Sequence, residues 1–298
     1  MADHTLCLTG GTGYIGRHLR ALLAAQNVGL VLIGRPGMQA VAEHGTETGL
    51  LWEDPKDLAQ TLAKLNNPVV INLAGHFVKS HTPSDINDIV AGNLTYPTQI
   101  FEACTLGGVT RLVNVGTSWE FSDKGAQEAF NLYAAVKAAN AVVARWYARE
   151  AGLRIVNLKL NDTYGGEDTR LKLMPLLKKQ AQAGTQVKLG FSDQRLNLLF
   201  IDDVLSGILA AVERTAHIDK GNVQETFLLA DETVSLGDLV ARIQSGPAPN
   251  LNVTFQSTAP EDSTLRDVWD DAPRLTGWKP AVNLDDGLAH YLSPKDSA

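Results

Sequence analysis

The sequence predicts an α/β fold built on a parallel sheet that is buried on both faces. Two observations lead to this class. Short, nearly continuous apolar segments alternate with longer segments of helical periodicity, as expected for parallel strands covered by helices. The first apolar segment, Leu6 to Leu8, runs directly into a glycine-rich stretch and then into a helical pattern. This order of strand, glycine turn and helix is the context of a nucleotide-phosphate site.

The glycine-rich stretch, TGGTGYIG, contains three regularly spaced glycines. Gly10 permits a tight turn, Gly13 lets the backbone approach a pyrophosphate, and Gly16 lets the helix pack close to the strand. The helix N-terminus that follows presents free N–H groups and a partial positive charge. The stretch therefore predicts a dinucleotide cofactor. The residues expected around it are Gly10, Gly11, Thr12, Gly13, Tyr14, Ile15 and Gly16.

Composition narrows the class of protein. The chain has 298 residues, of which 44% are hydrophobic and 20% charged, as in an ordinary globular protein with a substantial core. A net charge of −7 without a basic run argues against nucleic-acid binding. Cys7 and Cys104 form neither a metal-ligand spacing nor a disulfide framework. No leader-like start or membrane-spanning apolar stretch is evident, so a cytoplasmic protein without membrane contact is expected.

The second strand is expected at 28–33, and Arg35 follows it. An acidic residue here would bind the ribose 2′-OH of NAD, whereas a cation accepts the 2′-phosphate of NADP. Arg35 therefore favours NADP(H), with NAD(H) still possible. A short third strand is expected at 49–53, and Asp54 is a candidate for a contact near the adenine.

The fourth strand is expected at 68–73, and the small residues after it let the backbone approach a cofactor. Leu73, Ala74 and Gly75 are therefore expected beside the cofactor. Apolar periodicity predicts a helix over 86–104 with a kink at Pro97.

The fifth strand, expected at 111–115, leads toward a helix that opens near Asn131. Tyr133 and Lys137 lie one turn apart on the same face of that helix. The lysine charge is expected to lower the pKa of the phenol, so that the tyrosine exchanges a proton near neutral pH. These residues predict Tyr133 as the acid/base, with Thr117 hydrogen-bonded to the substrate oxygen that changes oxidation state.

Later elements follow the same alternation less regularly. They are a strand at 153–160, a helix at 171–183, a strand at 198–201, a helix at 203–212, a strand at 227–230 and a helix at 235–243. Asp202 or Asp203 is expected to cap the helix at 203–212.

These motifs resemble the extended short-chain dehydrogenase/reductase family, the group of nucleotide-sugar epimerases, dehydratases and reductases. The spacing T-G-x-x-G-x-x-G and the Tyr-x-x-x-Lys pair carry the resemblance, which runs from Leu6 to about Leu292. It implies a doubly wound, Rossmann-like sheet with a smaller, partly interleaved C-terminal substrate domain. The dinucleotide-binding domain would comprise 1–162 and be completed by segments near 196–245. The substrate domain would comprise 163–195 and 246–298.

The resemblance also implies roles for further residues. Asn93 matches an asparagine that orders the region near the cofactor, and Tyr133 and Lys137 also contact the cofactor. The expected substrate contacts are Thr117, Ser118, Asp162, Lys172 and Arg195. Where Asp162 falls, the family usually has asparagine. The most similar branch acts on CDP- or dTDP-activated 6-deoxyhexoses.

Several reactions are open to this residue set. Dehydration is disfavoured because family dehydratases have Asp-Glu where this chain has Ser118 and Trp119, neither of which supplies a titratable proton at neutral pH. A 4-keto reductase and a nucleotide-sugar 4-epimerase both need only Thr117, Tyr133 and Lys137. Arg35, through NADP(H), favours the reductase. A non-catalytic NAD(P)-binding sensor or scaffold is the remaining alternative.

A homodimer is expected from the helix at 133–150, which is apolar around more of its circumference than one sheet face covers. The helix expected at 86–104 would lie beside it. Two such helices from each subunit would form a four-helix interface about a two-fold axis, as the resemblance also implies, with Ala138 or Ala141 facing the partner.

Overall fold

A seven-stranded parallel sheet forms the centre of the computed structural model, which describes residues 4–170, 172–257 and 267–293. The strand order is β11-β6-β5-β4-β1-β2-β3, and every neighbouring pair is parallel. The strands are β1 (Leu6–Thr9), β2 (Leu30–Ile33), β3 (Glu47–Leu50), β4 (Val69–Asn72), β5 (Arg111–Thr117), β6 (Arg154–Leu160) and β11 (Val223–Leu228). The order reverses between β1 and β4, and ligands bind at such a reversal in open α/β sheets.

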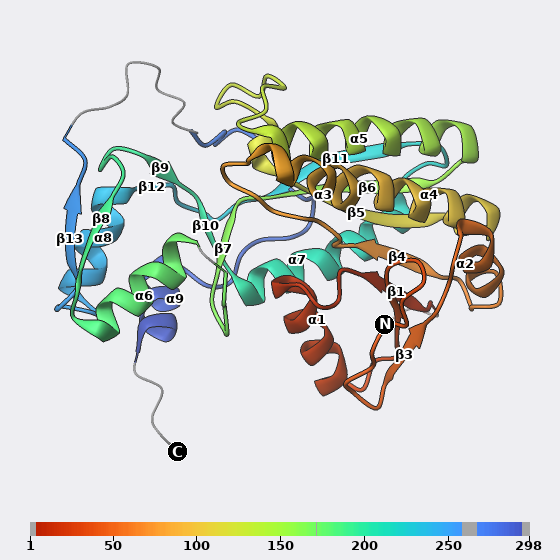
Figure 1. Ribbon diagram of the computed structural model, residues 1–298, viewed down its shortest axis with the longest axis horizontal. Helices are drawn as coiled ribbons and strands as arrows, with labels where there is room; N and C mark the ends of the chain where they lie inside the picture. The colour runs from red at the N-terminus through yellow and green to blue at the C-terminus, as the bar shows by residue number, and fades with distance from the viewer. Residues whose placement is uncertain (1–3, 171, 258–266, 294–298) are drawn as a thin grey trace.

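Helices cover both faces of this sheet (Figure 1). One face carries α2 (Pro55–Leu62), α4 (Tyr96–Leu106) and α5 (Leu132–Ala151), and the other carries α1 (Tyr14–Ala25) and α7 (Ile201–Arg214). Strand β1 shows why each strand is apolar throughout. Leu6 and Leu8 pack on the α1 and α7 side, whereas Cys7 packs on the α2 and α4 side, because strand side chains alternate between faces. The predicted doubly wound sheet is confirmed.

A smaller group of elements lies beyond the sheet, on the left in Figure 1. Its helices are α6 (Leu173–Ala183), α8 (Leu236–Ser245) and α9 (Leu284–Leu292). Its strands pair two by two: β7 (Asp162–Tyr164) with β10 (Leu198–Phe200), β8 (Gln186–Leu189) with β13 (Asn252–Phe255), and β9 (Arg195–Leu196) with β12 (Val234–Ser235). Separate stretches of the chain therefore build this group. The domain limits themselves stay a prediction.

The helix expected over 86–104 is divided. A π-helical turn, Ala91–Thr95, separates α3 (Ile86–Val90) from α4, and Pro97 lies in the first turn of α4. A proline is tolerated there because the first N–H groups of a helix lack intrahelical partners anyway. The break therefore precedes Pro97 and comes from the extra residue of the π turn.

Two other expectations are corrected. Neither Asp202 nor Asp203 is the N-cap of α7, because the helix begins at Ile201 and Phe200 precedes it. The buried carboxylate of Asp203 instead accepts hydrogen bonds from the N–H groups of Ala281 and Val282 at 2.7 and 3.1 Å. The third strand starts at Glu47 rather than at residue 49. In the described ranges, no helix has the length and apolar character needed to cross a membrane.

Candidate active site

The glycine turn between β1 and α1 shows the close approaches predicted for it. Gly10 has φ +70°, and a Cβ on it would lie 2.7 Å from the carbonyl carbon of Leu73. A Cβ on Gly16 would lie 2.3 Å from the Gly10 oxygen. Gly13 precedes α1 without a side-chain cap, and the first turn of α1 holds no acidic residue. The positive end of the helix is therefore open to an anion, so the turn fits the diphosphate of a dinucleotide.

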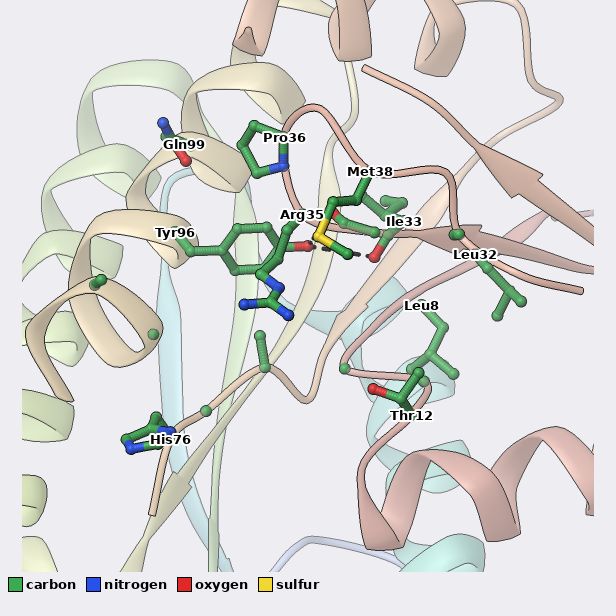
Figure 2. A pocket seen from close by; sticks show the side chains of 18 of the residues that line it. Leu8, Thr12, Leu32, Ile33, Arg35, Pro36, Met38, His76, Tyr96 and Gln99 are labelled. Carbon is green, nitrogen blue, oxygen red and sulfur yellow. Dashed lines mark hydrogen bonds between the residues drawn. The ribbon is translucent and has the colours of Figure 1, made fainter. Parts of the chain in front are cut away.

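A cavity of about 750 Å³ opens beside this turn, at the carboxyl ends of β1, β2 and β4 (Figure 2). Six of the predicted cofactor residues line it: Gly10, Gly11, Thr12, Arg35, Ala74 and Gly75. Met38, His76 and Tyr96 also line it and were not predicted. No sequence motif marks these three residues. Met38 and His76 lie on loops, and the Tyr96 hydroxyl contacts the backbone at the end of β2.

The other predicted cofactor contacts lie outside this lining. They are Gly13, Tyr14, Ile15, Gly16, Leu73, Asn93, Tyr133 and Lys137. Tyr14 turns away, because its hydroxyl donates to the Gly165 oxygen at 2.8 Å and its ring lies under the Arg170 guanidinium at 3.6 Å. Asn93 holds the loop after β4 by two hydrogen bonds to the backbone of His76, at 2.8 and 3.1 Å.

The turn that carries Arg35 is anchored from two sides. The Tyr96 hydroxyl donates to the Gly34 oxygen at 2.8 Å, and the Trp52 indole N–H donates to the same oxygen at 3.0 Å. Figure 2 shows the Arg35 side chain extending into the cavity beside Tyr96. Asp54 does not line the cavity. Its carboxylate caps α2 by accepting from the N–H groups of Lys56 and Asp57.

Arg20 also lines this cavity and is held in place by the carboxylate of Glu47. Its guanidinium makes a two-pronged hydrogen bond to Glu47, at 2.6 and 2.8 Å, and both side chains are buried. The hydrogen bonds from Arg20 hold the pKa of Glu47 at about 2. Arg20 is thus a structural cation, which the sequence analysis did not identify.

Lys137 is enclosed where β4 and β5 end. Its Nζ donates to the carbonyl oxygens of Ala74 and Val115, at 3.0 and 3.1 Å. Burial lowers the pKa of its ammonium to about 8, with Glu120 opposing and Lys159 reinforcing this shift.

Tyr133 lies one turn earlier on α5, with its ring edge-on to Phe77 at 5.1 Å. Burial raises the pKa of its hydroxyl, and the carboxylate of Glu120 raises it further. The net pKa of Tyr133 is therefore raised, rather than lowered as expected from the charge of Lys137. Desolvation is the larger effect, and the ammonium is directed to two carbonyl oxygens. Tyr133 consequently holds its proton at neutral pH.

Helix α5 is fixed to the sheet by a row of buried polar side chains. Asn72 of β4, Asn114 of β5 and Asn157 of β6 stand in register. The Asn114 amide donates to Asn140 of α5 at 2.8 Å and to Asn157 at 3.0 Å. Such a network fixes the helix in rotation and height, which places Tyr133 and Lys137 at the strand ends.

Thr117 ends β5, and its Oγ1 accepts a hydrogen bond from the Trp119 N–H at 3.3 Å. Ser118 and Trp119 begin a short 3₁₀ turn, Ser118–Glu120. The Trp119 ring packs against Phe77 at 5.6 Å and against Phe130 at 5.0 Å. An indole therefore occupies the place where the dehydratases of the family carry an acid, and it forms an apolar wall.

A second cavity has a volume of about 580 Å³. The three aromatic residues Phe77, Trp119 and Phe130 form part of its lining. Three lysines also line it: Lys79, Lys172 and Lys188. Of the predicted substrate residues, Asp162 and Lys172 are present here, whereas Thr117 and Ser118 lie outside the lining.

Arg195 is not brought into this cavity. Its guanidinium forms ion pairs with Asp267, at 3.2 Å, and with Asp270. In this structure Arg195 ties β9 to the segment that begins at 267, and its expected role in substrate binding stays a prediction. Lys188 of β8, which lines the cavity, was missed because no motif surrounds it.

The two cavities meet at residues 74–77. Ala74, Gly75 and His76 line the first cavity and Phe77 lines the second. Tyr133 contacts Phe77, and Lys137 contacts Ala74. Tyr133, whose side chain is half-buried, therefore lies beside the segment at which the two cavities adjoin. The fold is a doubly wound, Rossmann-type sheet, and its glycine turn and first cavity are typical of proteins that bind a dinucleotide.

Comparison with known proteins gives the family. Residues 6–227 match the NAD dependent epimerase/dehydratase family, and the chain belongs to it. A CDP-abequose synthase from Yersinia pseudotuberculosis is 30% identical over 211 residues, which cover 70% of this chain and 72% of that protein. A dTDP-4-dehydro-6-deoxyglucose reductase from Escherichia coli is 21% identical over 308 residues, covering 94% of each chain.

A solved structure shows the same fold. UDP-glucuronic acid 4-epimerase from Bacillus cereus, in complex with UDP-glucuronic acid and NAD, aligns with a TM-score of 0.78 at 20% identity. The alignment covers 97% of this chain and 98% of that one.

Proposed function

We propose that this enzyme uses NADPH to reduce the 4-keto group of a CDP- or dTDP-activated 4-keto-6-deoxyhexose. The observation that carries the proposal is the position of Tyr133, whose ring contacts Phe77 where the residues that line the two cavities adjoin. A reductase needs a proton donor there, because hydride addition to a ketone leaves an alkoxide. The names of the relatives, CDP-abequose synthase and dTDP-4-dehydro-6-deoxyglucose reductase, support the same substrate class.

The first cavity suits the cofactor. The glycine turn and the N-terminus of α1 would hold the diphosphate, and Arg35 would pair with a 2′-phosphate. Of the side chains that line this cavity, the one carboxylate is Asp88, which belongs to α3 rather than to the end of β2. The charge beyond β2 therefore supports NADPH over NADH. When bound, the reduced nicotinamide supplies the hydride.

The second cavity suits a nucleotide-activated deoxysugar. Lys172 and Lys188 supply positive charge for a diphosphate, whose charges need partners on leaving water. The aromatic wall of Phe77, Trp119 and Phe130 offers apolar surface to the methyl group of a 6-deoxyhexose. A fully hydroxylated sugar would leave hydroxyl groups unpaired against that wall.

The side chains of the site then divide the work. Tyr133 donates its proton to the ketone oxygen as the carbonyl carbon becomes a secondary alcohol carbon, and the resulting phenolate regains a proton from solvent. The Lys137 ammonium, held by Ala74 and Val115, stabilises that phenolate electrostatically. Thr117 hydrogen-bonds the same oxygen and orients the carbonyl.

A 4-epimerase is the second candidate, favoured by the aligned structure of an enzyme that epimerises a nucleotide sugar and holds NAD. The two functions differ in net redox change. We expect NADPH absorbance to fall in proportion to an added 4-keto-6-deoxyhexose nucleotide, and not without it. Interconversion of 4-hydroxy nucleotide sugars at constant NAD(P)H, detected by chromatography, would identify the epimerase instead.

A further inference from the structure

A buried carboxylate behind Thr117 has no part in the mechanism above. Glu120 is fully buried, its Oε1 accepts from the Thr117 N–H at 2.9 Å, and its Oε2 accepts from the Lys159 Nζ at 2.5 Å. Lys159 is also buried and reaches Glu225 at 3.1 Å. Desolvation largely offsets the attraction within a buried ion pair, so stability alone explains its presence poorly.

Helix capping accounts for only one of these contacts. Thr117 and Glu120 form a capping box around the 3₁₀ turn, an arrangement that serves equally well with an exposed glutamate. Here the carboxylate lies in the interior, and Lys159 from β6 compensates its charge there.

The carboxylate lies beside the reacting groups. Lys137 bonds the carbonyl of Val115, and Glu120 bonds the N–H of Thr117, two residues further along β5. A Cβ on the intervening Gly116 would lie 2.5 Å from the Glu120 Oε1.

The charged and titratable groups around Glu120 come from three elements. They are Lys159 of β6, Glu225 of β11 behind it, and Tyr133 and Lys137 of α5. The negative charge of Glu120 raises the pKa of both Tyr133 and Lys137.

We propose that Glu120 is a positioning residue for this reaction: it fixes the backbone of Thr117 and, with Lys159 as its counter-ion, holds a negative charge beside Tyr133 and Lys137. The charge favours the protonated forms of both groups, and a proton on Tyr133 is what donation to a ketone requires. This inference rests on the proposed reduction, so its test includes a measurement that needs no substrate.

The test is Glu120→Gln, which keeps the shape and removes the charge. We expect kcat at neutral pH to fall by about tenfold to a hundredfold, because Lys137 loses its proton at lower pH without the charge of Glu120. KM should stay unchanged, because Glu120 lines neither cavity. The alkaline limb of the pH–kcat profile should move to lower pH. Without substrate, phenolate absorbance measured against a Tyr133→Phe background should show Tyr133 ionising at lower pH than in the wild type.

Two further variants separate position from charge. Glu120→Asp keeps the charge but shortens the reach to the Thr117 N–H, so kcat should fall while the alkaline limb stays in place. Glu225→Gln is the matched control, since Glu225 contacts Lys159 and Arg145 and leaves Thr117 untouched. It should keep the wild-type kcat and pH profile.

Should Glu120→Gln fail to fold, the pair is removed together as Glu120→Gln with Lys159→Met, because replacing both members of a buried ion pair is often tolerated. A shift of Tyr133 ionisation to lower pH is again expected, smaller than in Glu120→Gln because loss of the Lys159 charge opposes it. Unchanged ionisation of Tyr133 in whichever variant folds would overturn the inference. Wild-type protein that consumes no NADPH would instead reject the proposed function, and the ionisation measurement would still decide the role of Glu120.

Discussion

Burial determines the chemistry of the single residues at this site. Tyr133 keeps its proton because its hydroxyl is desolvated and lies near the charge of Glu120. Lys137, enclosed between two carbonyl oxygens, has a pKa lowered to about 8. A phenol that keeps its proton at neutral pH is what the proposed reduction requires of Tyr133.

The clearest test at this scale is Tyr133→Phe, which removes one hydroxyl and keeps the ring against Phe77. We expect kcat for ketone reduction to fall by about a hundredfold or more, as loss of a general acid implies, while the Kd for NADPH stays unchanged. Steady-state kinetics and fluorescence titration of NADPH measure the two quantities. Turnover at the wild-type rate would remove Tyr133 from the mechanism.

Arg35 tests the choice of cofactor. A charge-assisted contact to phosphate is worth about 1.5–3 kcal/mol, so Arg35→Ala should weaken NADPH binding by about tenfold to a hundredfold and leave NADH binding unchanged. Calorimetric titration with both cofactors measures the difference. Equal affinity of the wild-type enzyme for NADH and NADPH would contradict the proposal and favour the epimerase.

Substitution of Lys188, compared with substitution of Arg195, tests which cation binds the substrate diphosphate. Lys188 lines the second cavity, whereas Arg195 is paired with Asp267 and Asp270 outside it. We expect Lys188→Ala to raise the KM for the nucleotide sugar by about tenfold or more, as loss of a charged contact implies, and Arg195→Ala to leave KM near its wild-type value. If Arg195→Ala raises KM and Lys188→Ala does not, Arg195 rather than Lys188 binds the diphosphate.

At the scale of elements, local pattern predicted the sheet well and its irregularities poorly. Strands β1, β2, β4, β5 and β6 follow from apolar runs, and the glycine turn follows from the steric needs of Gly10 and Gly16. Strands β3 and β11 contain no such run and begin earlier than expected, at Glu47 and Val223. The π turn at Ala91–Thr95 lies where α3 and α4 pack against α5, and periodicity along one helix does not indicate such packing.

Buried ion pairs were not predicted because their members lie far apart in the sequence. Glu120 and Lys159 are 39 residues apart in sequence, and only the parallel pairing of β5 and β6 brings them together.

The buried ion pair between Arg20 of α1 and Glu47 of β3 is a second long-range contact, and its contribution to the free energy of unfolding can be measured. Glu47 is buried against Arg20, and its pKa is held at about 2, below 4.5. Its ionised form therefore stabilises the fold above pH 4.5, and this contribution is lost as pH falls toward 2. Glu47→Gln should lower the free energy of unfolding by about 3–5 kcal/mol at pH 7, with a smaller loss near pH 2.

Urea unfolding at the two pH values measures this change, and Glu43→Gln provides the control. Glu43 lies 3.4 Å from the same guanidinium but is 57% exposed, so its loss should cost under about 1 kcal/mol. Equal changes in the free energy of unfolding for the two substitutions would show that the strength of the Arg20–Glu47 ion pair does not depend on burial.

At the scale of the whole molecule, an apolar stripe runs along the outer face of α5. Its members are spaced so that they follow one helix face: Ala135, Ala139, Val142 and Trp146. Val142 and Trp146 are 53% and 51% exposed, and Leu106 on the neighbouring α4 is 52% exposed. Ala138 and Ala141, expected at an interface, are instead buried within the chain and cannot report on a partner.

We propose that a second copy of the chain covers this stripe, because α4 and α5 pack side by side and a two-fold axis would bring the same apolar face onto itself. Light scattering at micromolar concentration should give about twice the 32.1 kDa of one chain. Val142→Glu and Trp146→Glu should each dissociate the dimer, because an unpaired carboxylate buried at an interface costs several kcal/mol. Leu51→Glu, at a position 56% exposed near β3, should leave the mass unchanged. A wild-type mass near that of one chain would reject the dimer, and dissociation by Leu51→Glu would place the interface elsewhere.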